Sequence, residues 1–302
     1  MSGNEVFWHI RYEPSIDPSK VDYRTVVVYK ETHATDSPTG ELVPGKKIDP
    51  SPVWTGTWRD GNPFNPEGQR PENALTGTIF TVNANRQDPM GVPSKLAKLR
   101  FWRNTDVAKL KDGEMAVFGN GMLGHEWDED LDNGFRPDGI IHLSEITFDG
   151  VPYPTDGGTV YDAGTATHNL TLYRAKSGAL VFGGGCVQYS WGLDDFHDNV
   201  TALNGSRSNP YSHRLQKDPY GAVKAVQQAT VNLFADMGIQ PSNLQADLVR
   251  ATQSTDKVAP VTKVTAPAAG SALAAGPLSI SGTATDAGGV VAMVELSFDG
   301  GK

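Results

Sequence analysis

The densest group of side chains able to do chemistry is an acidic run at residues 124–134. Its ionisable members are His125, Glu126, Asp128, Glu129, Asp130 and Asp132. Hard cations such as calcium prefer several carboxylate oxygens, and the alternation of Asp128, Asp130 and Asp132 resembles the start of a calcium-binding loop. The twelfth position of such a loop would be Gly139 instead of a glutamate, so a solvated acidic turn between strands is an equal alternative.

Within this run, Glu126 is the carboxylate most expected to be buried, because Trp127 follows it. A buried carboxylate beside a histidine can bind a metal or act as a general base. We therefore predict that Glu126 is a metal ligand and that His125 is catalytic. Asp128, Asp130 and Asp132 complete the predicted set of metal ligands.

A second candidate pair is Glu31 and His33, which follow a segment with strand character at 23–30. Continued strand alternation would place both side chains on one face, a spacing that suits shared metal binding or proton transfer. Both are predicted to be catalytic, and a solvent-facing pair at a strand end is the alternative. His168 and His197 lie among polar residues and are expected to make structural hydrogen bonds.

Composition excludes several kinds of partner. The 302 residues carry a formal net charge of -9 and no basic run, which argues against nucleic acid as a partner. No stretch approaches the ~20 apolar residues that span a bilayer, and the first residues lack the pattern of a signal peptide. The single cysteine, Cys186, cannot form an internal disulfide or a Cys-rich metal site. These patterns do not indicate an oligomeric state.

Segments typical of β-strands dominate the first 251 residues. β-branched and aromatic residues bounded by Gly, Pro, Asn or Asp predict strands at 23–30, 74–82, 97–103, 114–118, 140–148, 166–173 and 179–182. One helix is expected, with Pro219 at its first position and Gly238 after its end. Because ligands bind beyond the carboxyl ends of strands in open α/β sheets, residues 183–197 are the expected working edge.

Composition changes sharply near residue 252. All six Trp, all seven His and 25 of the 26 aromatic residues come before it. We expect a domain at 1–251, a polar linker at 252–260 and a module at 261–302. In the module, three alternating segments resemble strands of an immunoglobulin-like sandwich, which needs about seven strands, so we expect the module to be only partly present.

Six motifs carry a resemblance to a known family. They are Ser2–Trp8, Tyr29–His33, Trp54–Arg59, Gly124–Gly134, Gly164–His168 and Ala229–Gly238. As a set they resemble the N,N-dimethylformamidase large-subunit-like family over about residues 2–250, in the branch found in secreted bacterial proteins with trailing immunoglobulin-like modules. The resemblance implies an α/β fold, as the later part of a class I glutamine amidotransferase-like domain with β-rich insertions. In that family the first motif lies well inside the domain, so we expect the chain to begin part-way through it.

The resemblance also implies an activity. Characterised dimethylformamidases hydrolyse a small amide C–N bond at an iron held by two tyrosine phenolates and one glutamate. Glu126 is the best match to the glutamate, whereas Phe7 falls near one tyrosine position and has no phenolate. Iron is the cofactor that the resemblance implies, calcium is the alternative at the acidic run, and the implied location is extracellular.

A competing hypothesis is a non-catalytic extracellular module that binds a carbohydrate or another cell-surface ligand. In this hypothesis Trp54, Trp58 and Trp191 line a binding groove. The appended β-rich module and Phe7 motivate it, because the first is typical of spacer or adhesive units and the second removes a metal ligand.

Overall fold

The computed structural model describes residues 3–4, 6–33, 47–61, 65, 67–155, 158, 160–194 and 222–298. Its strands are β1 (Arg11–Glu13), β2 (Thr25–Val27), β3 (Ile79–Pro93), β4 (Met115–Glu129), β5 (Ile141–His142), β6 (Ile146–Pro154), β7 (Tyr161–His168), β8 (Thr171–Arg174), β9 (Leu180–Gly183), β10 (Val261–Ala266) and β11 (Ser281–Thr285). The α-helices of these ranges are α1 (Asn73–Thr76) and α3 (Lys224–Asp236). The 3-10 helices are η1 (Glu31–His33), η2 (Ser94–Leu96), η3 (Arg100–Trp102), η4 (Val107–Lys109) and η5 (Val187–Gly192).

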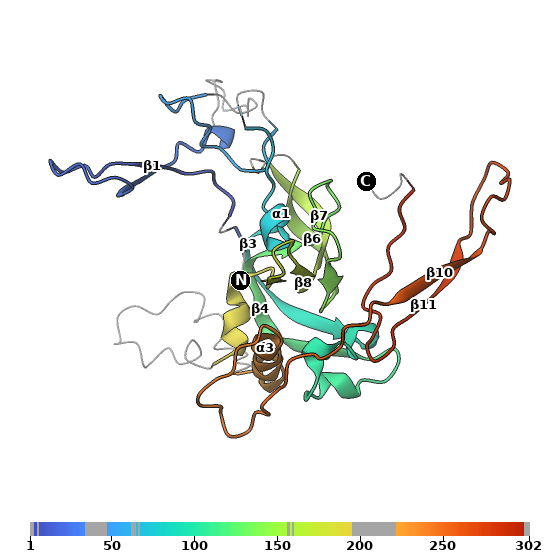
Figure 1. The fold of residues 1–302 in the computed structure, drawn as a ribbon. Coiled ribbons are helices and arrows are strands. Elements are labelled where there is room, and N and C mark those ends of the chain that lie inside the picture. The colour runs from blue at the N-terminus through green and yellow to red at the C-terminus, as the bar shows by residue number, and fades with distance from the viewer. Residues whose placement is uncertain are drawn as a thin grey trace.

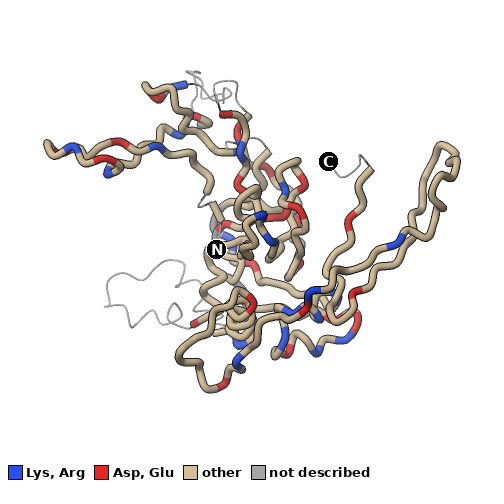
Figure 2. Tube along the Cα trace, in the orientation of Figure 1, with Lys and Arg blue, Asp and Glu red and all other residues tan. Residues whose placement is uncertain are grey.

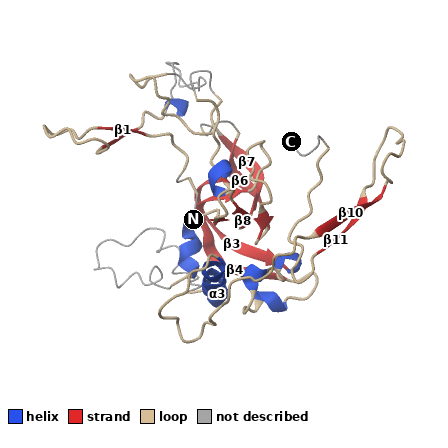
Figure 3. Cartoon of the chain, in the orientation of Figure 1, coloured by secondary structure: helices blue, strands red, loops and turns tan. Residues whose placement is uncertain are grey.

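Two antiparallel sheets form the body of the chain (Figures 1 and 3). The larger has the strand order β3-β4-β7-β6, and the smaller has the order β5-β8-β9. β3 and β4 are 15 residues each and pair along most of their length, with register shifts that increase their twist. This long ribbon carries the acidic run at the end of β4.

The main core lies between the β3–β4 ribbon, η3 and α3. Its fully buried members include Val82, Met90, Trp102, Met122, Leu123, Trp127, Val226 and Ala229. α3 contributes Val226, Ala229 and Leu233, whose spacing places them on one face of the helix. The expected helix is therefore confirmed from Lys224, and the first predicted turn lies outside the described residues. Phe234, next to Leu233, is 45% exposed.

The expected α/β fold is wrong for this chain. The described structure is mostly β, and every strand pairing in it is antiparallel. Parallel strands need a crossover connection, usually a helix, whereas β8 and β9 are joined by the short turn Ala175–Gly178. The described residues of the range 183–197 therefore do not lie at the carboxyl edge of an open α/β sheet, where a ligand site was expected.

Several predicted strands have a different structure. Residues 97–103 lie in 3-10 turns, because Leu96, Leu99 and Trp102 are three residues apart and all face the core. Residues 74–82 divide between α1 and the start of β3. The predicted strands 140–148 and 166–173 each split into two strands that belong to different sheets.

Side-chain hydrogen bonds cause this change of sheet. Ser144 Oγ accepts a hydrogen bond of 2.7 Å from the backbone N–H of Leu170, and Asn169 Nδ2 donates one of 3.0 Å to the carbonyl of Ser144. These bonds satisfy backbone groups that the strand ladder would otherwise pair, so the chain can turn both near Ser144 and near Asn169.

Two β-hairpins extend away from the body (Figure 1). β1 pairs with β2, and β10 pairs with β11. All six residues of β10 are exposed. The segment after β11 returns to the body, where Ala292 packs against the core and Glu295 forms an ion pair with Arg136. Within the described part of the chain, none of the helices is long and apolar enough to cross a membrane.

Candidate functional site

The acidic run lies on a strand, and strand alternation divides its side chains between two sides of the sheet. Trp127 packs against Phe148 and His168 on the side that faces β6 and β7. On the other side Asp128 accepts a hydrogen bond of 2.8 Å from Thr78 Oγ1. The run is therefore part of the sheet as far as Glu129, and a calcium loop cannot begin at Asp128 without ending β4 earlier.

Glu126 lies beside the N-terminal segment. A Cβ on Gly3 would be 3.4 Å from the carbonyl oxygen of Glu126 and 3.8 Å from its Cβ atom. The same position on Gly3 is 3.3 Å from Val187 in η5. The structure thus brings together two motifs that are more than a hundred residues apart in sequence, and Glu126 is partly buried.

The three aspartates of the run have separate surroundings. Asp128 is buried and its backbone N–H donates to the carbonyl of Gly185 at 2.8 Å. Asp130 accepts hydrogen bonds from Arg136, at 2.8 Å from Nε, and lies 2.7 Å from His142 Nε2. Asp132 is exposed. The carboxylates of Asp130 and Asp128 are thus engaged with different partners.

No group of three His, Cys, Asp or Glu side chains able to hold a metal converges in the described part of the chain. Metal binding by Glu126, Asp128, Asp130 and Asp132 stays a prediction. So does catalysis by His125, which lies in β4 but whose side chain is outside the described structure.

The second predicted pair does not share a strand face. Glu31 and His33 belong to η1, a 3-10 turn, and the structure does not describe the side chain of His33. Positive φ angles at Tyr23 and Lys30 bound the short strand β2, which ends at Val27. The strand alternation that paired Glu31 with His33 is therefore wrong.

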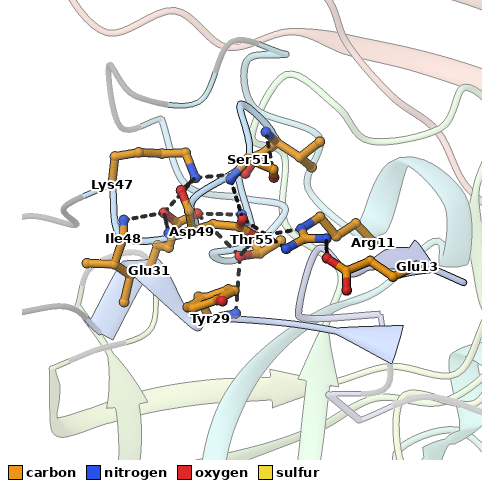
Figure 4. A network of polar contacts seen from close by, with 10 residues as sticks. Arg11, Glu13, Tyr29, Glu31, Lys47, Ile48, Asp49, Ser51 and Thr55 are labelled. Atoms are coloured by element: carbon orange, nitrogen blue, oxygen red, sulfur yellow. Dashed lines mark hydrogen bonds and ion pairs between the residues drawn. The ribbon is translucent and has the colours of Figure 1, made fainter. Parts of the chain in front are cut away.

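Glu31 is fully buried at the centre of a polar network (Figure 4). Its Oε1 accepts hydrogen bonds from Lys47 Nζ at 2.9 Å and from the backbone N–H of Asp49 at 2.8 Å. Its Oε2 accepts one of 2.7 Å from the backbone N–H of Thr55. Burial alone would raise the pKa of Glu31, but these donors hold it below its ordinary value. A carboxylate with so many donors is suited to holding loops together and not to accepting a further proton.

A pair that was not selected from the sequence, the buried carboxyl of Glu129 and the partly buried phenol of Tyr153, lies across the larger sheet. Burial raises the pKa of Glu129, against opposing effects from the Thr167 backbone N–H and the hydroxyl groups of Thr81 and Tyr153. Burial and the nearby Glu129 raise the pKa of Tyr153 to about 12. Tyr153 packs over Gly164. A Cβ atom on Gly164 would be only 2.7 Å from the Cβ atom of Tyr153. Nothing in the local sequence of β6 indicates this pairing, because it depends on the strand register.

His168 is completely buried opposite Ile146 and Glu129 in the strand ladders. Its Nε2 lies 3.3 Å from the carbonyl oxygen of Gly184, consistent with the structural role expected for it. Burial lowers its pKa to about 3, so the ring is neutral in the folded chain at neutral pH. His197, the other histidine expected to be structural, lies outside the described residues.

Replacing His168 with glutamine is expected to reduce the loss in free energy of unfolding as the pH falls from 6.5 to 4.5. An unfolded histidine has a pKa near 6.5, so the unfolded chain binds a proton that the folded chain excludes until about pH 3. Stability from this group is present above pH 6.5 and is lost as the pH falls. Urea unfolding at pH 6.5 and 4.5 should show about 2 kcal/mol more loss in the wild type than in His168→Gln. Equal losses would contradict a neutral buried ring.

A sequence model described as N,N-dimethylformamidase beta subunit-like, C-terminal, matches residues 1–202. The chain belongs to this dimethylformamidase-like family. A second model, a bacterial Ig domain, matches residues 260–302. No curated protein and no solved structure is significantly similar to the chain.

Membership of the dimethylformamidase-like family over residues 1–202 confirms the resemblance drawn from the motifs in that range, and the Ig match confirms the immunoglobulin-like module. The matched range includes Gly3, Phe7 and Glu126, and it excludes α3. Phe7 is buried and packs edge-on against Trp8 and Phe80, with the Arg59 guanidinium 5.1 Å from its ring centroid. In this chain the position near which the family places a tyrosine is therefore part of an aromatic cluster.

Proposed function

We propose that the domain hydrolyses the C–N bond of a small amide, with Glu126 as the carboxylate of the site. The observation that supports the proposal most directly is that Gly3 lies close to the backbone carbonyl of Glu126, which brings two motifs of the matched range together in space. In the proposed reaction, water attacks the amide carbonyl carbon and Glu126 takes its proton as general base. The C–N bond then breaks, and the proton passes to the leaving nitrogen.

The described residues do not fit the iron site of characterised dimethylformamidases. That site uses two phenolates and one glutamate, whereas Phe7 offers no oxygen and its ring is enclosed by Trp8 and Phe80. Glu126 alone would remain as a ligand among the residues assigned to that site. The hydrolysis proposed here therefore gives Glu126 the role of base, and iron or calcium binding stays a separate prediction.

Replacing Glu126 with glutamine is expected to lower kcat/KM for amide hydrolysis by about a hundredfold or more, because general-base catalysis contributes about 10²–10⁴-fold. The measurement is the release of dimethylamine from N,N-dimethylformamide and of ammonia from formamide and acetamide. The matched control is Glu145→Gln, which removes a surface carboxylate paired with Lys95 and should change turnover by less than about twofold.

Metal content measured on the same preparations separates the two roles of Glu126. Stoichiometric iron in the wild type that is lost in Glu126→Gln would replace the base role with metal ligation. Turnover that survives in Glu126→Gln would remove this residue from the mechanism altogether.

A non-catalytic binding module is a second proposal, and the enclosed ring of Phe7 favours it. Of the aromatic residues expected to line its groove, Trp54 is fully buried, while Trp58 stacks on His9 at a ring centroid distance of 3.8 Å. Trp54 is therefore not part of any exposed groove. Binding of Trp58 or Trp191 to a glycan, with no amide turnover, would favour this proposal over the hydrolase.

We also propose an extracellular location, either secreted or at the cell surface. The match to a bacterial Ig domain at residues 260–302 supports this proposal. Fractionation of the parent bacterium, with detection of the chain in the medium or cell-surface fraction, tests it directly.

A further inference from the structure

A cleft of about 790 Å³ lies where residues 253–292 meet the body. The body supplies an apolar floor to it, made of Leu99, Phe101, Ile141, Leu143, Leu172 and Leu180. Its volume falls within the range of about 300–1,000 Å³ that is usual for ligand sites, and such sites are common between domains. The cleft lies apart from Glu126, which is not among its lining residues.

Two carboxylates approach each other on the wall formed by residues 256–289. A Cβ on Gly289 would collide with Asp286 Oδ2 and would lie 2.9 Å from Asp256 Oδ2. The absence of a side chain on Gly289 therefore leaves room for both carboxylates beside this residue. Asp286 Oδ1 is buried and has no hydrogen-bond partner among the described residues. Asp256 Oδ1 accepts the backbone N–H of Val258 at 2.9 Å.

Cationic side chains line the cleft beside this acidic pair, and Figure 2 shows Lys and Arg gathered where the base of the β10–β11 hairpin meets the body. Arg100 and Arg103 are held by ion pairs with Asp236. Arg174 Nη1 donates a hydrogen bond of 2.7 Å to the carbonyl of Gly178, which leaves its other guanidinium N–H groups for a further acceptor.

We propose that this cleft binds a short apolar peptide with both termini free. The ammonium group would bind Asp256 and Asp286, and the carboxylate would bind Arg174, with Lys98 or Lys257 beside it. The apolar side chains would cover the leucine-rich floor. The aspartate pair would repel a simple anion, and the more numerous Lys and Arg side chains would repel a simple cation. A zwitterion, which carries both charges, therefore complements the lining best.

The test uses the full chain and tri-leucine as the probe, with binding measured by isothermal titration calorimetry. One-to-one binding is expected, and blocking the amine by acetylation should weaken it about tenfold or more, as should amidation of the carboxylate. These two arms need no protein variant, so they do not depend on whether a mutant folds.

On the protein side, Asp286→Asn should weaken binding of tri-leucine about tenfold or more. The matched control, Asp162→Asn, changes an exposed aspartate on β7 outside the cleft and should leave binding unchanged. Thermal melting of both variants checks folding. No binding of tri-leucine at 1 mM (about one hundredfold above a 10 μM Kd), or equal binding of the capped peptide, would overturn the proposal. Amide turnover is not a readout here, so failure of the hydrolase proposal leaves this result unaffected.

Discussion

Replacing Glu31 with alanine is expected to destabilise the chain by about 3–5 kcal/mol, the usual cost of removing one partner from a buried ion pair. The change leaves the backbone N–H groups of Asp49 and Thr55 without their acceptor, and Lys47 without its counter-ion. Chemical unfolding followed by circular dichroism measures the effect. The control Glu13→Ala removes a half-exposed partner of Arg11 and should cost less than about 1 kcal/mol.

The same network is expected to make the stability of the chain depend on pH. Asp49 accepts hydrogen bonds from Arg11 and Ser51, which lower its pKa below the ordinary value although burial alone would raise it. Because the pKa values of Glu31 and Asp49 are lowered on folding, their contribution is complete above the unfolded values of about 4 and is lost as the pH falls below them. Glu31→Ala should lose less stability than the wild type between pH 5 and 3. A steeper loss in the variant would contradict the network.

Replacing Trp127 with alanine is the second large change, with an expected cost of about 3–5 kcal/mol. The indole is fully buried between Phe148 and His168, and its Nε1 donates a hydrogen bond of 3.0 Å to Asp88. Alanine leaves a cavity in the main core and removes one of the donors to the Asp88 carboxylate, which Arg86 also contacts. The measurement is again urea unfolding, with attention to whether the slope with urea is unchanged.

Two further variants divide this cost. Trp127→Phe keeps most of the ring volume and loses the hydrogen bond, so it should cost about 1–3 kcal/mol. Phe135→Ala removes an aromatic residue that is 37% exposed and should cost less than about 1 kcal/mol. A Trp127→Ala cost as small as that of Phe135→Ala would mean that the sheet can close around the missing ring.

The sequence patterns identified the family and many of the strands, but not the fold class. The β8–β9 hairpin was predictable, because two short β-branched segments flank a turn with Gly178. The length of β3 and β4 was not, because their middle parts contain Gly and Asn, which disfavour strands. Gly124 is present for a tertiary reason, since a Cβ there would overlap the side-chain oxygen of Gln188 from η5. Such a contact cannot be read from either segment alone.

The candidate site was predictable to a similar extent. The expectation that Glu126 is the most buried carboxylate of the run is wrong, because Glu126 is only partly buried whereas Asp128 and Glu129 are buried. Strand alternation sends Trp127 and Glu126 to opposite sides of the sheet, so burial of one does not imply burial of the other. The partners of Asp130 could not be predicted, because Arg136 and His142 reach it through a turn of unknown geometry. Glu31 was selected by residue type, but its role follows from five donors that come from residues 47–55.

Arg136 connects two parts of the molecule that match different sequence families. Its guanidinium binds Asp130 at the end of the acidic run and also pairs with Glu295 in the bacterial Ig match. The acidic residue after β4 and the segment after β11 therefore share one cation. Local unfolding of either segment removes one of the two ion pairs of Arg136. Local opening of the two should be cooperative, so hydrogen exchange at Glu129 and Asp130 should report on the state of a module that begins 130 residues later in the chain.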